Sequence, residues 1–178
     1  MAHLKHLLIE ELQDLLHAET QLTKVLPQMA QAAHNPKLKE AFQKHLAQTE
    51  QHVERLEEAF QFLGEKAQPR PCKAMVGLIE EGKEQMQEGK NKDEIIADLA
   101  LITAAQKVEH YEISGYGTAR SLARLIDEKD VARLLDHTLG EEESADFLLS
   151  SVAKPLLQHA RMADMGAREE DLELVRSR

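Results

Sequence analysis

Acidic residues interrupt the apolar positions of several predicted helices in this chain. Glu19 lies seven residues after Leu12 and seven before Leu26, which places its carboxylate on the apolar face of the first helix. A carboxylate that points into a helical bundle is costly to bury unless a metal ion or a counter-charge meets it. The spacing therefore predicts an inward-facing metal ligand at Glu19. The alternative is a glutamate at the core boundary whose charged end reaches water.

The most specific acidic pair lies in the third long helix, where Glu109 and Glu112 are three residues apart. Both fall on one helical stripe with Ile102, Ala105 and Tyr116. Two carboxylates on one face repel each other, and a divalent cation between them removes this repulsion. We therefore predict that Glu109 and Glu112 bind a metal ion. The alternative is a polar helix face that is acidic without being a site.

The other two long helices supply further candidates. His52 of the second helix is a candidate nitrogen ligand, the alternative being a histidine at the surface or boundary. In the fourth helix, Glu141 and Glu142 are each flanked by leucines seven residues away on both sides, so periodicity does not choose between them. His45, His110 and His137 form no local ligand motif. The predicted metal ligands are thus Glu19, His52, Glu109, Glu112, Glu141 and Glu142.

Helical periodicity also predicts the elements that position these residues. Asn35 and Pro36 form an N-cap signal, Gly64 is a stop signal, and Pro27 is expected to bend the first helix. The predicted helices cover residues 3–34, 36–63, 74–87, 94–126 and 131–159. We predict an all-α bundle of four long helices, arranged as two helical hairpins over residues 1–160, with the short helix in the crossover. Residues 161–178 are predicted to be a charged tail with a frayed end.

Composition narrows the functional classes. The chain has 178 residues, 22 Lys and Arg against 32 Asp and Glu, and a formal net charge of −10. This charge argues against nucleic acid or an anionic membrane surface as a partner. One cysteine excludes an intramolecular disulfide framework. The sequence contains neither a signal peptide nor an apolar run of about 20 residues that would span a bilayer, so we expect a cytoplasmic protein.

Several segments carry a resemblance to a known family. They include Asp14-Leu-Leu-His-Ala-Glu19, His45-Leu-Ala-Gln-Thr-Glu-Gln-His52, Lys107-Val-Glu-His-Tyr-Glu112 and Leu139-Gly-Glu-Glu142. Over about residues 4–154 the chain resembles the YciE/YciF-type family of ferritin-like stress proteins, and it is closer to the YciF side. The resemblance implies a ferritin-like bundle with a small extra helix, a homodimer and a role in a bacterial stress response.

More distantly, the chain is similar to rubrerythrins and bacterioferritins. Glu19 matches their first-helix glutamate, His52 matches the histidine of the second-helix Glu-x-x-His motif, and Glu109-x-x-Glu112 resembles the third-helix pair of rubrerythrins. The segment from Glu141 to Ser144 matches the fourth-helix Glu-x-x-His motif. Two departures stand out: Thr49 replaces the bridging glutamate of the second helix, and Ser144 replaces a nitrogen ligand.

Our leading hypothesis is a stress protein that binds one or two iron or manganese ions through core carboxylates and reacts with peroxide or oxygen. The main alternative is a metal-free dimeric structural or interaction protein. In that interpretation the inward carboxylates are protonated, or hydrogen-bonded to His52, Gln106 and Tyr116. Iron storage in a hollow shell is the least favoured alternative.

Overall fold

The structure, a computed structural model, describes residues 2–176, with side-chain surroundings up to residue 166. Five helices account for the secondary structure of this part of the chain, which confirms the predicted all-α fold. They are α1 (Ala2–Ala32), α2 (Pro36–Leu63), α3 (Lys73–Gly89), α4 (Glu94–Leu125) and α5 (Lys129–Arg176). None of these helices is long and apolar enough to cross a membrane.

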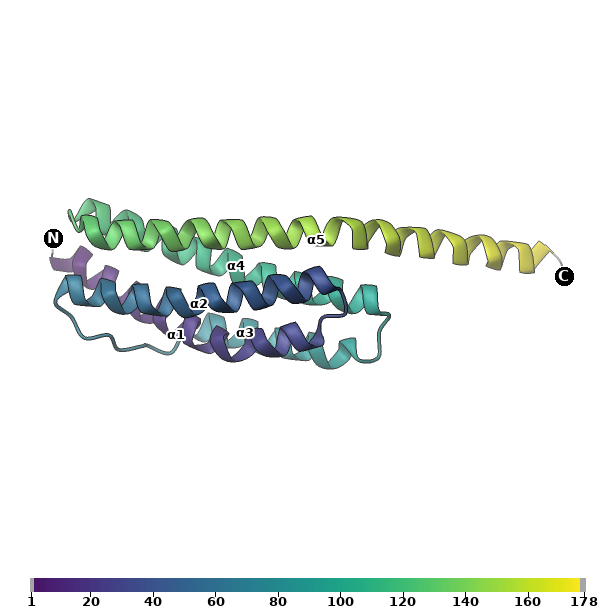
Figure 1. Cartoon of the computed structure of the whole chain (residues 1–178), viewed down its shortest axis with the longest axis horizontal. Helices are drawn as coiled ribbons and strands as arrows, with labels where there is room; N and C mark the ends of the chain where they lie inside the picture. The colour runs from purple at the N-terminus through teal and green to yellow at the C-terminus, as the bar shows by residue number, and fades with distance from the viewer. Residues whose placement is uncertain (1, 177–178) are drawn as a thin grey trace.

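The four long helices pair as two hairpins, α1 with α2 and α4 with α5 (Figure 1). Each hairpin also contacts the other, because α1 packs on α4 and α2 packs on α5. The short helix α3 lies in the crossover between the hairpins and packs against α4 and α1 from outside the bundle. One side chain from each long helix can therefore reach a common interior point.

Capping groups set the ends of the first hairpin. The Asn35 side chain accepts hydrogen bonds from the first turn of α2, and Pro36 occupies the first helical position. Gly64 ends α2 with a φ of 70°, a conformation that favours glycine. The buried carboxylate of Asp98 in α4 accepts hydrogen bonds from the backbone N–H groups of His34 and Asn35, at 2.8 and 2.7 Å. This contact fixes the α1–α2 turn against the second hairpin.

Helix α5 is longer than the sequence predicted. The predicted end near His159 is wrong, because the helix continues to Arg176 and extends past the other helices (Figure 1). Pro155 lies inside α5 without ending it, and the following residues are rich in Ala, Leu, Met, Glu and Arg, which favour helix. Of the predicted tail, residues 177–178 lie outside the described residues. The domain boundary at residue 160 stays a prediction.

The interior consists of two apolar clusters with a polar layer between them. Along α1, Leu15 belongs to one cluster, Leu22 belongs to the other, and Glu19 lies between them. The same order holds in α5, where Leu139 and Leu149 are in different clusters. The apolar clusters therefore enclose the polar layer along the bundle axis and keep bulk water away from it.

The two glycines beside the polar layer in α4 have different surroundings. A Cβ atom at Gly115 would lie 2.9 Å from Leu15 Cδ2, whereas a Cβ atom at Gly117 would meet nothing within 4 Å. Close helix packing therefore explains Gly115 but not Gly117.

We expect Gly117→Ala to raise the free energy of unfolding by about 1 kcal/mol through helix propensity. Gly115→Ala should be less stable than Gly117→Ala by about 1–3 kcal/mol, because it overpacks the contact with Leu15. Urea unfolding of the metal-free proteins measures both changes. Equal stability of the two variants would show that the Leu15 contact relaxes without cost.

Candidate metal centre

Five of the six predicted ligands converge in the polar layer. Glu19 comes from α1, His52 from α2, Glu109 and Glu112 from α4, and Glu142 from α5. Each of these residues is at most 3% exposed. The apolar periodicity of α1 and α4 turns Glu19, Glu109 and Glu112 inward, as the sequence predicted, whereas periodicity did not choose between Glu141 and Glu142. Metal binding by these residues stays a prediction.

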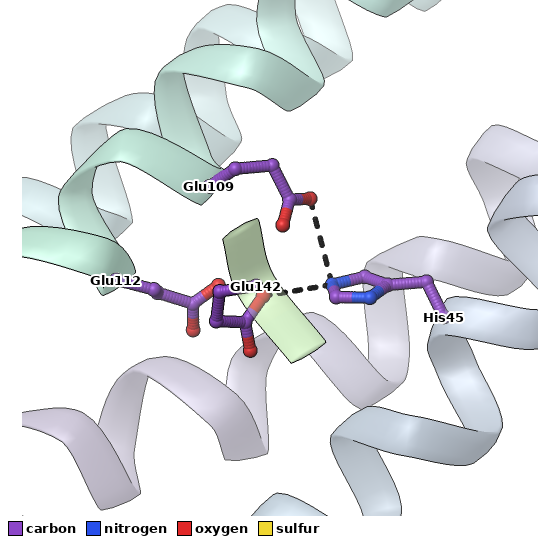
Figure 2. A group of neighbouring side chains, drawn as sticks. All are labelled: His45, Glu109, Glu112 and Glu142. Carbon is purple, nitrogen blue, oxygen red and sulfur yellow. Dashed lines mark ion pairs between the residues drawn. The ribbon is translucent and has the colours of Figure 1, made fainter. Parts of the chain in front are cut away.

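The first group of side chains contains His45, Glu109, Glu112 and Glu142 (Figure 2). His45 Nε2 lies 3.4 Å from Glu109 Oε1 and 3.6 Å from Glu142 Oε2. Glu112 extends from α4 towards Glu142 (Figure 2). One ligand atom from each residue lies within 4.8 Å of the others. This spread is close to the ~4.2 Å that separates opposite ligand atoms of an ion with bonds of about 2.1 Å.

The second group contains Glu19, His52 and Glu142, so Glu142 is shared by both groups. His52 Nδ1 lies 2.8 Å from Glu142 Oε1 and 3.2 Å from Glu19 Oε1. Tyr116, which is fully buried, donates a hydrogen bond of 2.5 Å from its hydroxyl to the same oxygen of Glu19. Glu142 would therefore be a ligand of both ions if each group held one, and ferritin-like di-metal proteins also build their sites from glutamates and histidines of facing helices.

The structure decides between Glu141 and Glu142. Glu142 points inward and is fully buried, whereas the Glu141 side chain is 20% exposed and pairs with Arg55 at the edge of the bundle. Glu141 belongs to neither group, although its Oε2 lies 3.0 Å from His52 Nε2. Burial raises the pKa of Glu141, but the hydrogen bond from Arg55 outweighs it and the net shift is downward. Glu141 therefore contacts the outward-facing Nε2 of the His52 ring and helps to fix its orientation.

The position of Glu142 changes the comparison with the Glu-x-x-His motif. Counted from the inward-facing Glu142, the position of the fourth-helix histidine is Ala145, one residue after Ser144. The expected match of Ser144 to that histidine is therefore wrong by one residue. In α2, Thr49 does occupy the place of the glutamate of the Glu-x-x-His motif. It is fully buried and brings no carboxylate to the layer.

Sequence reasoning missed His45. This residue is buried, and it is one of the four side chains of the first group. The signal was its distance from His52: seven residues are about two helical turns, which place both rings on the same face of α2. A search for a compact motif of three or four residues overlooks a pair with this spacing.

The protonation states of the layer follow from burial and from the two histidines. Burial raises the pKa of Glu109 and Glu112 well above the usual range, and the neighbouring carboxylates raise both further. Burial also raises the pKa of Glu142, but His52 and His45 outweigh it and the net shift is downward. For His52, burial lowers the pKa, but Glu142 and Glu19 raise it to about 10. Without a metal, the layer therefore contains protonated His52 beside ionised Glu142.

Several buried oxygens in the layer have no hydrogen-bond partner. Both carboxyl oxygens of Glu112 lack one, as do Glu109 Oε2 and Thr49 Oγ1. An unpaired buried carboxyl oxygen costs free energy, because it loses its hydration and receives no donor in exchange. The unpaired oxygens of Glu112 are therefore the feature of the layer that best fits a cation.

Comparisons with known proteins agree on the family. Residues 3–162 match the family described as a domain of unknown function, DUF892. The chain is 42% identical to protein YciF of Escherichia coli K12 over 154 residues, which covers 86% of this chain and 92% of YciF.

Solved structures give the same result. The crystal structure of the Escherichia coli stress protein YciF matches with a TM-score of 0.84 and 38% identity, over 89% of this chain and 99% of that one. YcfI of Rhodopseudomonas palustris, which has been suggested to be a structural protein, matches with a TM-score of 0.78 and 38% identity. The match covers 83% of this chain and 92% of YcfI. The predicted family is confirmed. The chain therefore belongs to the DUF892 family and is a relative of the stress protein YciF.

Proposed function

We propose that this YciF-type protein binds two divalent metal ions, iron or manganese, in the polar layer of its bundle. The supporting observation is the unpaired state of both Glu112 oxygens among four buried glutamates and two buried histidines. Four carboxylates and two imidazoles are also the ligand set of ferritin-like di-metal sites. Such oxygen and nitrogen ligands suit both proposed metals.

The ligands are distributed differently here from the usual ferritin-like arrangement. That arrangement takes one glutamate from each of two helices and a Glu-x-x-His pair from each of the other two. Here α2 contributes His45 and His52 but no carboxylate, and α4 contributes both Glu109 and Glu112. The second glutamate of α4 thus takes the place of the one lost at Thr49. His45 likewise takes the place of the missing histidine of α5.

In the proposed function the metal ions supply redox chemistry with peroxide or oxygen. The protein's own residues do the rest. Glu142 lies between both groups, and Tyr116 orients Glu19 through its hydroxyl. Arg55 and Glu141 hold the outer side of the His52 ring. The apolar clusters on both sides exclude water, which strengthens each electrostatic contact in the layer.

A metal-free dimeric structural protein is the second candidate. One observation that favours it is the contact of His52 with Glu19 and Glu142, which neutralises part of the buried charge without a metal. Another is a set of exposed apolar side chains on α5 that a second copy of the chain could cover. This set comprises Phe147, Leu148, Leu157, Met162 and Met165.

Metal content separates the two functions. Protein purified without chelator is expected to contain iron or manganese, measured by mass spectrometry. The Glu109→Gln/Glu112→Gln variant should lose at least the ion of the first group. Glu54→Gln/Glu57→Gln is the matched control, because these glutamates are also three residues apart on one helix but are exposed. If the wild-type protein stays metal-free after anaerobic loading with either metal, the proposed metal binding is wrong and the metal-free structural protein remains.

A further inference from the structure

One cavity reaches the polar layer from the surface between α2 and α5. Its polar and charged lining comes from Lys44, His45, Gln48, Glu109 and Ser144, and Ala145 adds to the wall from α5. The cavity offers about 40 Å³ to the centres of water-sized molecules, whereas one water needs about 10–15 Å³. It can therefore hold a molecule of two heavy atoms, such as oxygen or hydrogen peroxide.

The cavity meets only one side of the layer. His45 and Glu109 line it, and both belong to the first group. Glu19 and His52 of the second group do not line it and have no exposed surface. A small molecule that enters from α2 and α5 thus arrives at the first group.

A small side chain at one position explains the opening. Ala145 stands three residues after Glu142, where a Glu-x-x-His motif carries its histidine. An imidazole at this position would extend from α5 towards the first group and occupy part of the cavity. The methyl group of Ala145 leaves that space open, while His45 brings an imidazole from α2 instead.

We infer that this cavity is the entrance through which oxygen- or peroxide-sized molecules reach the metal centre, and that Ala145 keeps it open. The inference rests on the proposed function. Apolar side chains from Phe42, Leu148 and Leu149 share its wall with the polar groups, which suits small neutral molecules. The exposed Lys44 adds one positive charge to the wall. The positions of Ala145 and Ser144 control access without being ligands.

Nitric oxide is a suitable probe, since it is neutral, has two heavy atoms and changes the absorption spectrum of ferrous iron. We expect anaerobic, iron-loaded Ala145→Leu to bind nitric oxide at least about tenfold more slowly than wild type, a barrier increase of about 1.4 kcal/mol. Ala145→Ser, which adds only one hydroxyl, should bind at nearly the wild-type rate. Ala163→Leu is the matched control, because Ala163 is exposed on the same helix and does not line the cavity.

Iron content, measured on the same samples, separates two kinds of failure. Equal iron content with an unchanged nitric oxide rate in Ala145→Leu would overturn the entrance alone. Absence of iron from the loaded wild type would overturn the proposed function and the entrance with it. If Ala145→Leu does not fold, Ser144→Leu tests the same rim from an exposed position, and slower binding is again the expected result.

Discussion

Glu142→Gln is expected to abolish binding of both metal ions and to destabilise the metal-free protein. Glu142 is the one residue that belongs to both ligand groups. Glu19→Gln should therefore affect only the group that contains His52, and Glu109→Gln should affect only the group that contains His45. Mass spectrometry of metal-loaded protein should find no bound ion in Glu142→Gln. It should find about one ion in each of the other two variants.

The effect on stability has a separate cause. Glu142 Oε1 lies 2.8 Å from His52 Nδ1, and both side chains are fully buried. Removing one partner of a buried charge pair costs about 3–5 kcal/mol. Because Glu19 and Glu141 also contact His52, we expect the lower end, about 3 kcal/mol. In a protein of this length that lowers the melting temperature by roughly 6–12 °C.

The adjacent Glu143→Gln is the control, because Glu143 is exposed and lies outside both groups. It removes the same charge from the same helix, and its metal content and melting temperature should match those of wild type. A Glu142→Gln variant that still binds two ions would show that neither ion depends on the Glu142 carboxylate.

The sequence predicted which carboxylates turn inward because helical periodicity is a local property. Glu19, Glu109 and Glu112 each interrupt an apolar stripe of their own helix, and each is buried in the structure. Glu142 was not separable from Glu141, because leucines flank both at the same spacing. The choice depends on the rotation of α5 against α2. Arg55 of α2 holds Glu141 at the bundle edge, and the sequence of α5 alone does not contain that contact.

The composition of the ligand set depends in the same way on packing between helices. Thr49 brings no carboxylate, as the sequence indicated, but the two side chains proposed to compensate for it and for the absent histidine come from different helices. His45 and Glu112 meet only because α2 and α4 both contribute to one interior layer. The end of α5 shows the reverse case. The charged tail after residue 160 suggested an early end, yet good helix formers continue the helix to Arg176.

We expect the metal-free protein to lose stability as the pH rises from 6.5 to 8.5. The folded pKa of His52 is raised from 6.5 to about 10, so its contribution is complete below pH 6.5 and is lost as the pH rises towards 10. The raised pKa values of Glu109 and Glu112 act in the same direction. Their carboxyls ionise more readily in the unfolded chain, which favours unfolding as the pH rises above 4.5. Each proton released on unfolding changes the free energy by about 1.4 kcal/mol per pH unit.

Manganese should reverse this trend. Metal ions bind neutral imidazole and ionised carboxylates, so binding displaces the protons from His52, Glu109 and Glu112, and affinity rises with pH. Urea unfolding at pH 6.5, 7.5 and 8.5, with chelator or with manganese, measures both trends. In Glu109→Gln/Glu112→Gln the metal-free slope should be shallower, because the surface charges are unchanged and only the layer has lost two ionisable groups. A metal-free stability that is constant or rises over this range would contradict the protonation states assigned to the layer.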